Sequence, residues 1–277
     1  MYLISNNIGN IFDITFRSLH ILKNVDLILS EDTRIIKKIL YLFKIKNKII
    51  SFNDYNEKNK YKIIINKILN ENINIAIIPD KGTPIINDPG FLLIKEAIKN
   101  KINIFSIPGP CSIIASLIIS GLDTSNFIFK GFIPRNKNNR YKLFNKLKNN
   151  KNTIILYETS KRLYNSIIDI KNIFNEKSKI VIVKEITKKY EEIIRSDIKN
   201  IINKLNNITI KGEITILIKN YNNKLLFNNY KINYIINILK KYNINNKNII
   251  NIIKDIFNIN KNKIYSIIIN KKNKSIY

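Results

Sequence analysis

Carboxylates and glycines are concentrated in a loop that follows one short apolar stretch. Ile75–Ile78 runs directly into two turns, which carry Asp80 and Asp88 and end at Gly90. A loop of this kind exposes backbone N–H and C=O groups, and the Asp80 carboxylate accepts hydrogen bonds from a ribose or an amine. Gly90 at the start of a helix would add N–H groups that face an anion or a dipole. The alternative is a structural Pro/Gly turn in which Asp88 caps the helix.

A second rigid turn favours the ligand-binding interpretation. The apolar stretch that ends at Ile107 is followed by Pro108-Gly109-Pro110-Cys111-Ser112 and then by a helical pattern. Two strands that end in rigid, glycine-bearing loops define one crevice, so we expect a binding site between these loops.

A third loop carries two carboxylates and an arginine at residues 31–34, Glu-Asp-Thr-Arg. Asp32 or Thr33 could simply cap the following helix, and Glu31 and Arg34 could form an i,i+3 pair. However, the chain has only six arginines, and a guanidinium binds phosphate in a bidentate way that an ammonium cannot. We therefore interpret three arginines that follow strand ends or turn motifs as site residues: Arg34, Arg135 and Arg162.

The composition excludes several chemistries. One cysteine (Cys111) and one histidine (His20) exclude a disulfide framework, a Cys/His zinc cage and a Cys–His nucleophilic pair. The sequence contains no Walker loop, Gly-x-Gly-x-x-Gly motif or metal-ligand pattern, so we expect no metal site. The chemistry then requires a nucleotide-like cofactor in a crevice and a few carboxylates.

The net charge of +28 comes from 48 Lys and Arg against 20 Asp and Glu. It favours an anionic partner, either nucleic acid or an acidic surface. Most of it is lysine spread evenly along a chain rich in Ile and Asn, as codon choice in an AT-rich genome would produce. No apolar run approaches the length of a membrane span, and the start has no signal core. The sequence predicts a soluble, cytoplasmic protein.

The elements that position these loops alternate between short strands and amphipathic helices. Such alternation predicts βαβ units and a parallel sheet, in which ligands collect at the carboxyl ends of the strands. In the first half the expected strands are Tyr2–Ile4, Asp26–Leu29, Lys48–Ser51, Ile75–Ile78 and Ile102–Ile107, and the expected helices are Thr15–Leu22, Thr33–Leu42, Glu57–Asn70 and Gly90–Asn100.

The same alternation resumes after residue 120. The expected strands are Phe127–Phe129, Thr153–Tyr157, Lys179–Lys184 and Glu213–Lys219, with a hairpin from Lys179–Lys184 to Glu191–Arg195, and the expected helices are Lys137–Lys148, Lys161–Phe174 and Asp197–Leu205. Three helices then follow, Lys231–Lys241, Asn245–Phe257 and Lys261–Asn270, with turns at Asn243 and Asn258. We expect two α/β domains, residues 1–120 and 121–221, and a basic helical tail, residues 222–277, as a candidate nucleic-acid-binding appendage.

Ten motifs occur in register over about residues 2–219. They are Ile8-Gly9-Asn10-Ile11-Phe12-Asp13-Ile14-Thr15, Glu31-Asp32-Thr33-Arg34, Asn56-Glu57, Asp80-Lys81-Gly82-Thr83-Pro84, Asp88-Pro89-Gly90, Pro108-Gly109-Pro110, Gly131-Phe132-Ile133-Pro134-Arg135, Tyr157-Glu158, Glu185-Ile186-Thr187-Lys188 and Lys211-Gly212-Glu213. Together they resemble the tetrapyrrole methylase superfamily, in particular its members that methylate ribosomal RNA.

This resemblance implies two α/β domains with S-adenosylmethionine in a cleft between them, commonly in a homodimer. The implied reaction is 2′-O-methylation of a cytidine ribose in the decoding region of 16S rRNA, in the small ribosomal subunit. The residues that it implies for cofactor binding are Ile8, Gly9, Asn10, Asp80, Gly82, Thr83, Pro84, Asp88, Pro108, Gly109, Pro110, Tyr157, Gly212 and Glu213.

The proton of a ribose hydroxyl needs an acceptor. The catalytic candidates are Glu31, Asp32 and Glu158, and the sequence does not rank them. The three arginines named above would hold the RNA backbone near the reacting nucleotide, and lysine-rich surfaces would add non-specific attraction.

The chain departs from the family pattern at several positions. Asn6-Asn7 replaces Thr-Pro, Asn53 replaces a histidine, and Thr159-Ser160-Lys161 replaces Ser-Pro-His. Pro79 and Lys81 replace a serine and a small residue, and Lys184 replaces an arginine. The missing histidines remove any histidine-based role there. Two other functions remain open: methylation of a tetrapyrrole, and a non-catalytic RNA-binding or ribosome-assembly factor that retains the fold.

Overall fold

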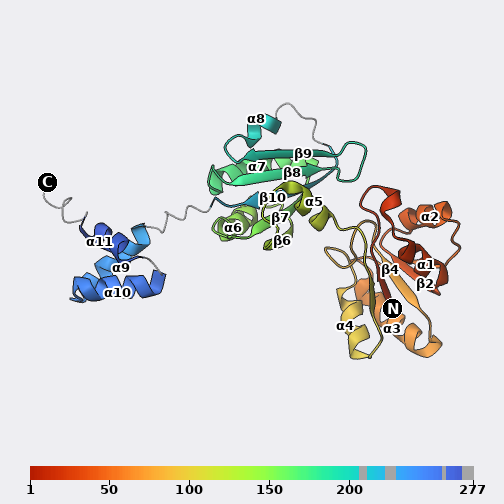
Figure 1. The fold of residues 1–277 in the computed structure, drawn as a ribbon. Coiled ribbons are helices and arrows are strands. Elements are labelled where there is room, and N and C mark those ends of the chain that lie inside the picture. Colours follow the sequence, from red (N-terminus) through yellow and green to blue (C-terminus); the bar gives the residue numbers. More distant parts are fainter. Residues whose placement is uncertain (206–210, 222–228, 258–259, 270–277) are drawn as a thin grey trace. The chain divides into compact units, whose positions relative to one another are not determined.

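The structure is a computed structural model that describes residues 1–205, 211–221, 229–257 and 260–269. The chain forms two compact units, residues 1–221 and residues 222–277. The first unit contains two five-stranded sheets, and Figure 1 shows its elements in chain order from red through yellow and green to light blue. In the described part of the chain, no helix has the length and apolar character needed to cross a membrane.

The first sheet is entirely parallel, as the strand–helix alternation predicts, with the order β3-β2-β4-β1-β5. Its strands are β1 (Tyr2–Ile4), β2 (Leu27–Ser30), β3 (Ile49–Ser51), β4 (Ile75–Ile78) and β5 (Phe105–Ile107). The intervening helices are α1 (Phe16–Asn24), α2 (Thr33–Leu42), α3 (Glu57–Glu71) and α4 (Phe91–Lys99), and a short 3₁₀ helix, η1 (Ile11–Asp13), precedes α1.

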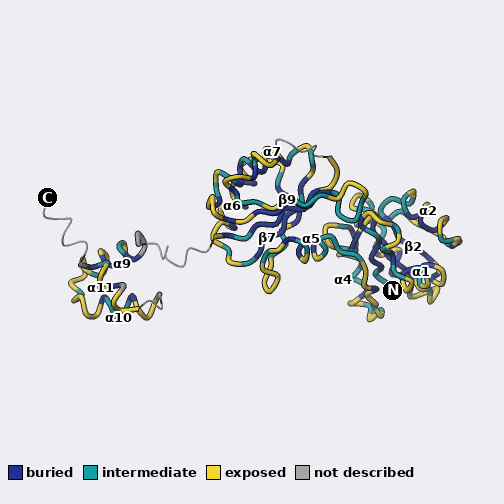
Figure 2. Tube along the Cα trace, turned by 45° about the horizontal axis from the view of Figure 1, so that its top comes forward, coloured by how far each residue is buried: buried dark blue, intermediate teal, exposed yellow. Residues whose placement is uncertain are grey.

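Both faces of the first sheet are covered because its strands are apolar on both sides. Ile28 of β2 belongs to a core cluster with residues of α1 and α2. Leu27 and Leu29 of the same strand belong to a second cluster with residues of α3 and α4. Alternate residues of a strand point to opposite faces, so the continuous apolar run of β2 is buried from both sides. Figure 2 shows β2 as mainly buried.

The second sheet is mixed and has the order β6-β7-β10-β8-β9. Its strands are β6 (Phe127–Phe132), β7 (Thr153–Thr159), β8 (Lys179–Lys184), β9 (Glu192–Asp197) and β10 (Glu213–Lys219), and its helices are α6 (Lys137–Leu147), α7 (Ser160–Ile173) and α8 (Ile201–Leu205). Only β6 and β7 pair in parallel. The predicted hairpin is confirmed as β8 and β9, and β10 inserts antiparallel between β7 and β8.

Helix α5 (Ser112–Ser120) packs on the second sheet, although it directly follows the last strand of the first. Ile113 and Leu117 belong to a core cluster with Ile155, Val181 and Leu217 of that sheet. The opposite face of the sheet is covered by α6, α7 and α8. The chain therefore passes from one sheet to the other at residues 108–111. The domain boundary between residues 120 and 121 stays a prediction.

Two predicted elements begin several residues later in the structure than predicted and are shorter. The first residues of the stretch predicted as Ile102–Ile107 do not pair, and β5 starts at Phe105. The helix predicted from Asp197 begins at Ile201, because β9 continues to Asp197, which forms an ion pair of 2.7 Å with Lys179 on the neighbouring strand.

The second unit consists of three helices, α9 (Asn229–Lys241), α10 (Asn246–Phe257) and α11 (Lys261–Ile269). Each helix contributes two buried isoleucines to one core, namely Ile232 and Ile236, Ile249 and Ile253, and Ile264 and Ile268. Asn243 has a positive φ of 58° at the predicted turn, a conformation that asparagine tolerates better than most residues. Asn258 and Asn270 lie outside the described residues.

Candidate active site

The loops at the carboxyl ends of β1 and β4 are joined by a buried asparagine. The side chain of Asn6 is fully buried, and its Nδ2 donates to the backbone oxygens of Pro79 and Asp80 at 3.0 and 2.9 Å. The backbone N–H of Asn6 also donates to Gly82 O at 2.8 Å. Asn6 thus fixes the path of the loop after β4.

Two further bonds connect the neighbouring loops. One Asp80 carboxylate oxygen accepts a hydrogen bond of 2.9 Å from the backbone N–H of Asp32. The Thr83 hydroxyl donates to Pro110 O at 3.3 Å. Strands β4 and β5 are not adjacent, since β1 lies between them, but their loops meet. The expected crevice is therefore formed by the loops that follow β1, β2, β4 and β5.

A cleft of about 500 Å³ lies between these loops and the second sheet. This volume lies within the range of about 300–1,000 Å³ that is typical of small-molecule sites. Its lining is formed by Ile8, Ile35, Asp80, Lys81, Gly82, Thr83, Ile86, Asn87, Asp88, Cys111, Ser112, Ile113, Phe132, Tyr157, Glu158, Thr159, Val183, Ile186, Gly212, Glu213, Ile214 and Thr215.

The residues expected to bind the cofactor divide into two groups. Those that line the cleft are Ile8, Asp80, Gly82, Thr83, Asp88, Tyr157, Gly212 and Glu213. Those that lie in the same loops but outside this lining are Gly9, Asn10, Pro84, Pro108, Gly109 and Pro110. A Cβ on Gly109 would lie 2.8 Å from the Cβ of Ser5. The absence of a side chain at Gly109 therefore serves loop packing.

The second sheet and helix α5, which packs on it, contribute residues to the lining that the sequence did not single out. Most are apolar, such as Ile113, Val183 and Ile214, and they cannot be recognised in a chain so rich in isoleucine. Ser112 is more informative because its hydroxyl lies 2.6 Å from the Tyr157 hydroxyl. Burial raises the pKa of Tyr157, whose ring also contacts Phe132. In the sequence, Ser112 could have been identified as a lining residue by its position at the end of a rigid turn.

Carboxylates from three loops lie close enough to repel one another. Burial, followed by repulsion from Glu31, Asp80 and Asp54, raises the pKa of Asp88 to about 7. Burial and the charge of Asp80 likewise raise the pKa of Glu31. Among the described residues, no group donates a hydrogen bond to either side chain. These carboxylates provide a negative, partly desolvated environment that favours a cation.

Asp32 differs from Glu31 because it is engaged by an arginine. Both Asp32 oxygens accept hydrogen bonds from Arg34, at 2.6 to 3.1 Å. The Arg34 side chain nevertheless remains 85% exposed. These hydrogen bonds lower the pKa of Asp32 to about 2. Asp32 also caps α2 by accepting from the Arg34 N–H, so the alternative in which Asp32 is a helix cap is confirmed. The suggested pair of Glu31 with Arg34 is wrong, because Arg34 pairs with Asp32.

Glu158 is enclosed by donors. One of its oxygens accepts from the Ser166 hydroxyl at 2.5 Å, and the other accepts from the Thr159 N–H at 2.8 Å and pairs with Arg162. The side chain is fully buried. Arg162 also donates to Ile133 O and to the Thr159 hydroxyl. This arrangement favours a positioning role for Glu158 and Arg162, and their catalytic and RNA-binding roles stay predictions.

The scarce arginines serve structure more often than the sequence suggested. Arg140 forms a buried ion pair of 2.5 Å with Asp169. Arg195 donates to the backbone oxygens of Ile119 and Ser120 at the end of α5. Arg135 is exposed, like Arg34. Exposure therefore favours Arg34 and Arg135 as contacts for an anion.

Backbone N–H groups at the N-terminus of α4 donate hydrogen bonds to a side chain of the same protein. The carboxylate of Glu57, at the start of α3, accepts hydrogen bonds from the backbone N–H groups of Gly90 and Leu92 at 3.0 and 2.9 Å. The expectation that Gly90 presents N–H groups to a ligand is therefore wrong. The alternative, Asp88 as the cap, is also wrong, because no cap bond comes from its side chain.

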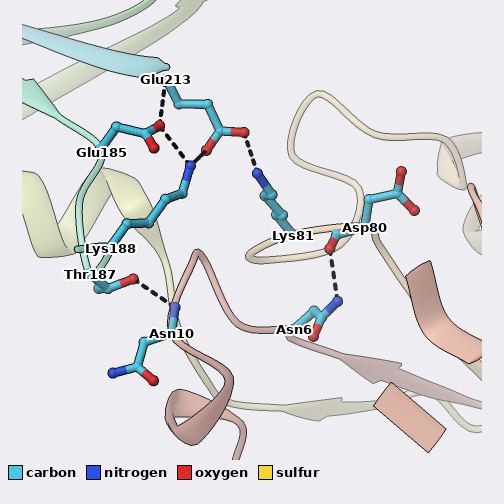
Figure 3. A network of polar contacts seen from close by, with 8 residues as sticks. All are labelled: Asn6, Asn10, Asp80, Lys81, Glu185, Thr187, Lys188 and Glu213. Carbon is cyan, nitrogen blue, oxygen red and sulfur yellow. Dashed lines mark hydrogen bonds and ion pairs between the residues drawn. The ribbon is translucent and has the colours of Figure 1, made fainter. Parts of the chain in front are cut away.

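Four charged residues at the edge of the cleft form a rim network, which comprises Lys81, Glu185, Lys188 and Glu213 (Figure 3). Lys81 Nζ lies 2.6 Å from Glu213 Oε1, and Lys188 Nζ lies 2.9 Å from Glu213 Oε2 and 2.7 Å from Glu185 Oε1. Burial by itself would raise the pKa of Glu213, but the bonds from Lys81 and Lys188 outweigh it and lower the pKa.

Comparisons with known proteins agree with this architecture. Residues 1–202 match the family model of the Tetrapyrrole (Corrin/Porphyrin) Methylases. Ribosomal RNA small subunit methyltransferase I of Buchnera aphidicola subsp. Baizongia pistaciae is 40% identical over 81% of this chain and 77% of its own length. The proteins of the same name from B. aphidicola subsp. Acyrthosiphon pisum and Rickettsia prowazekii are 37% and 36% identical, each over 98% of this chain and 97% of their own length.

Solved structures share the fold at low sequence identity. Cobalt precorrin-4 methyltransferase, a cobalamin biosynthetic enzyme, superimposes with a TM-score of 0.59 at 17% identity and covers 79% of this chain and 93% of its own. Diphthine synthase gives a TM-score of 0.60 at 10% identity, over 79% and 89%. The chain thus belongs to the tetrapyrrole methylase family, and within it to the group of ribosomal RNA small subunit methyltransferases I.

Proposed function

We propose that this methyltransferase transfers the methyl group of S-adenosylmethionine to the 2′-oxygen of a cytidine ribose in the decoding region of 16S rRNA. The observation that carries the proposal is a cleft lined by both sheets, next to a loop that exposes the Arg34 guanidinium. Relatives with the printed name Ribosomal RNA small subunit methyltransferase I support the substrate class.

The residues of the cleft fit S-adenosylmethionine. Its volume suits a nucleoside-sized ligand, and its lining combines apolar side chains with a few polar groups. Asp80 and Asp88 supply negative charge for the sulfonium and amino groups of the cofactor, and Ile8, Ile113 and Ile214 provide apolar contacts. When bound, the cofactor supplies an electrophilic methyl group.

Positioning of two bound reactants accounts for most of the expected rate enhancement. Glu31 is the best-supported acceptor for the proton of the 2′-hydroxyl, because its carboxylate has no donor among the described residues and burial raises its pKa towards the range of a useful base. Asp32 is held by Arg34, and Glu158 is held by Ser166 and Arg162. Both are therefore weaker candidates.

The exposed arginines would position the RNA backbone. Arg34 follows β2 at the same sheet edge as the carboxylates, and Arg135 follows β6. Phosphate contacts fix the register of a nucleic acid without reading its sequence. Arg162 would act indirectly, by holding Glu158 and the backbone at Ile133.

The test is incubation of the protein with labelled S-adenosylmethionine and small ribosomal subunits that lack the modification, followed by mapping of the label. The expected result is label on one cytidine ribose. Label on a base would contradict the reaction, and label transferred only to a porphyrinoid would support tetrapyrrole methylation. Binding to subunits without any binding of S-adenosylmethionine would support a non-catalytic assembly factor.

The proposal extends to a homodimer in the cytoplasm. Ile114 and Ile118 of α5 are 45% and 68% exposed in the single chain, so a second copy would shield apolar surface that one copy leaves open to water. Light scattering on the purified protein is expected to give the mass of a dimer, and a monomeric mass at micromolar concentration would contradict it.

The proposed location in the cytoplasm is tested separately. Fractionation of cells is expected to recover the protein with the soluble cytoplasmic material.

A further inference from the structure

The rim network links the two sheets across the mouth of the cleft. Lys81 follows β4 of the first sheet, whereas Glu213 begins β10, and Glu185 and Lys188 follow β8, all in the second sheet. Figure 3 shows Lys81 extending towards Glu213 from the opposite side to Lys188. The Lys81–Glu213 ion pair of 2.6 Å therefore joins parts of the fold that have separate cores.

A second contact reaches the same region. The Thr187 hydroxyl accepts a hydrogen bond of 3.1 Å from the backbone N–H of Asn10. A Cβ on Gly9 would lie 2.4 Å from Lys188 Cγ, so only glycine allows this close approach. The loop between β8 and β9 thus contacts the loop after β1 as well as the start of β10.

The backbone of the β8–β9 loop is held in an unusual conformation. Glu185 and Thr187 have positive φ values of 49° and 64°, which non-glycine residues rarely adopt. The Glu185 carboxylate accepts from the Glu213 N–H at 2.8 Å, and the Glu191 carboxylate accepts from the Thr187 N–H at 2.6 Å. Such a conformation persists only where the surrounding contacts stabilise it, so the loop position depends on the carboxylates that bind it.

The Lys81–Glu213 pair is not needed to build either sheet. Its side chains are 45% and 59% exposed, and each sheet packs its own helices. Both residues line the cleft, together with their neighbours Gly82 and Gly212. Breaking the pair should therefore change access to the cleft more than it changes the stability of the fold.

We propose that the Lys81–Glu213 ion pair, supported by Lys188, controls how fast S-adenosylmethionine enters and leaves the cleft. This inference rests on the proposed function, since it takes that cofactor as the ligand. In this proposal the cofactor enters between the loop after β4 and the start of β10, and separation of the two breaks the ion pair. The intact pair therefore slows both entry and release, and Lys81 acts as a positioning residue for the loops.

The experiment measures release of labelled S-adenosylmethionine from the full-length protein after addition of excess unlabelled cofactor. In the Lys81→Ala variant release is expected to be about two- to five-fold faster, the range that an exposed ion pair can contribute. Lys81→Arg retains the charge and is expected to keep the rate within about two-fold of the unaltered protein. The matched control is Lys179→Ala, which removes an ion pair of 2.7 Å within the second sheet, and it is expected to leave release unchanged.

The dependence of the release rate on ionic strength provides a second readout. Raising the ionic strength from about 0.05 M to about 0.5 M screens exposed charges, so release from the unaltered protein should accelerate while release from Lys81→Ala should hardly change. Equal release rates in the unaltered protein and Lys81→Ala at low salt would overturn the inference, and so would release from Lys179→Ala as fast as from Lys81→Ala. Complete failure to bind S-adenosylmethionine would instead overturn the proposed function, so the two failures are distinguishable.

Discussion

The Glu57 carboxylate accepts hydrogen bonds from the backbone N–H groups of both Gly90 and Leu92, and it thereby connects the start of α3 to the start of α4. The side chain is only 9% exposed. An anion at a helix N-terminus is stabilised by the N–H groups and by the helix dipole. In this chain the N-terminus of α4 is thus occupied by an internal carboxylate.

Loss of this carboxylate is expected to destabilise the fold. Glu57→Ala leaves two N–H groups without their charged acceptor and should cost about 1.5–3 kcal/mol of unfolding free energy. Glu57→Gln keeps an oxygen acceptor and should cost about 1 kcal/mol. Urea unfolding measures both. Glu71→Ala is the control, because Glu71 forms an exposed ion pair with Lys67 on the same helix. A loss in this control as large as in Glu57→Ala would contradict the assignment.

The raised pKa of Asp88 predicts that the stability of the fold depends on pH in a specific way. Its pKa is raised from 3.8 to about 7 by burial and by Glu31, Asp80 and Asp54. Between these values the folded state binds more protons than the unfolded state, so the Asp88 contribution to stability is present in full at low pH and is lost as the pH rises towards 7. Asp88→Asn removes this contribution. Urea midpoints across pH 4 to 8 should therefore fall less steeply in the variant, and parallel curves would refute the role of Asp88.

The same carboxyl should make cofactor binding depend on pH. A cationic ligand favours the ionised form of Asp88, so the affinity for S-adenosylmethionine should fall as the pH decreases below about 7, by at most about tenfold per pH unit. In Asp88→Asn the affinity should be weaker at pH 8 and nearly independent of pH. Calorimetry measures this, with heats corrected for proton uptake. An unchanged pH dependence in the variant would exclude Asp88 as the titrating group.

Glu31 and Glu158 should respond in opposite ways to removal of their charge. Glu31→Gln should lower kcat by about 10²-fold or more if Glu31 accepts the proton, without loss of stability, because it relieves repulsion with Asp80. Glu158→Gln should cost about 3 kcal/mol of unfolding free energy, since it leaves the partly buried Arg162 without its partner. Methylation rates and urea unfolding on both variants separate the roles. Full activity in Glu31→Gln would exclude it as the proton acceptor.

Arg34 should contribute to RNA affinity through charge. If its guanidinium contacts one phosphate, Arg34→Ala should reduce the slope of log affinity against log salt by about 0.7 for single-stranded RNA. Its pairing with Asp32 leaves the side chain 85% exposed and therefore accessible. Lys67→Ala on α3 removes one exposed charge that is already paired with Glu71, and it serves as a control. Equal slopes in Arg34→Ala and in the unaltered protein would exclude a phosphate contact at Arg34.

Local patterns predicted most elements of the fold well. The bounds of β1, β4, β8, β10 and α2 agree with those predicted, because each is a short apolar run or an amphipathic repeat bounded by turn residues. Apart from the β8–β9 hairpin, the strand pairing of the second sheet did not follow from such patterns. Strand β10 inserts between β7 and β8, and strand order depends on which apolar faces pack together over long chain separations.

The site was predictable only in part, for the same reason. Asp80 and Asp88 follow a buried strand and could be identified as candidates directly. The partner of Gly90 could not, because Glu57 lies a full strand and helix away along the chain. The hydrogen bond from Ser166 to the Glu158 carboxylate and the ion pair with Arg162 likewise form only once β7 and α7 are packed together.

The sequence by itself determined the strand–helix alternation, the rigid loops that carry the carboxylates and, through motifs in register, the family. These depend on residue types at short spacing, which local propensity and turn chemistry control. Only the tertiary structure decided which charges are free to act. The Arg34 side chain stays exposed to solvent, and the Glu31 carboxylate has no hydrogen-bond donor among the described residues. The carboxylates of Glu57 and Glu158, by contrast, accept hydrogen bonds from within the fold. The physical reason is that burial, neighbouring charges and hydrogen bonds determine the pKa of a charged group and its ability to bind a ligand. These surroundings are set by packing between distant parts of the chain.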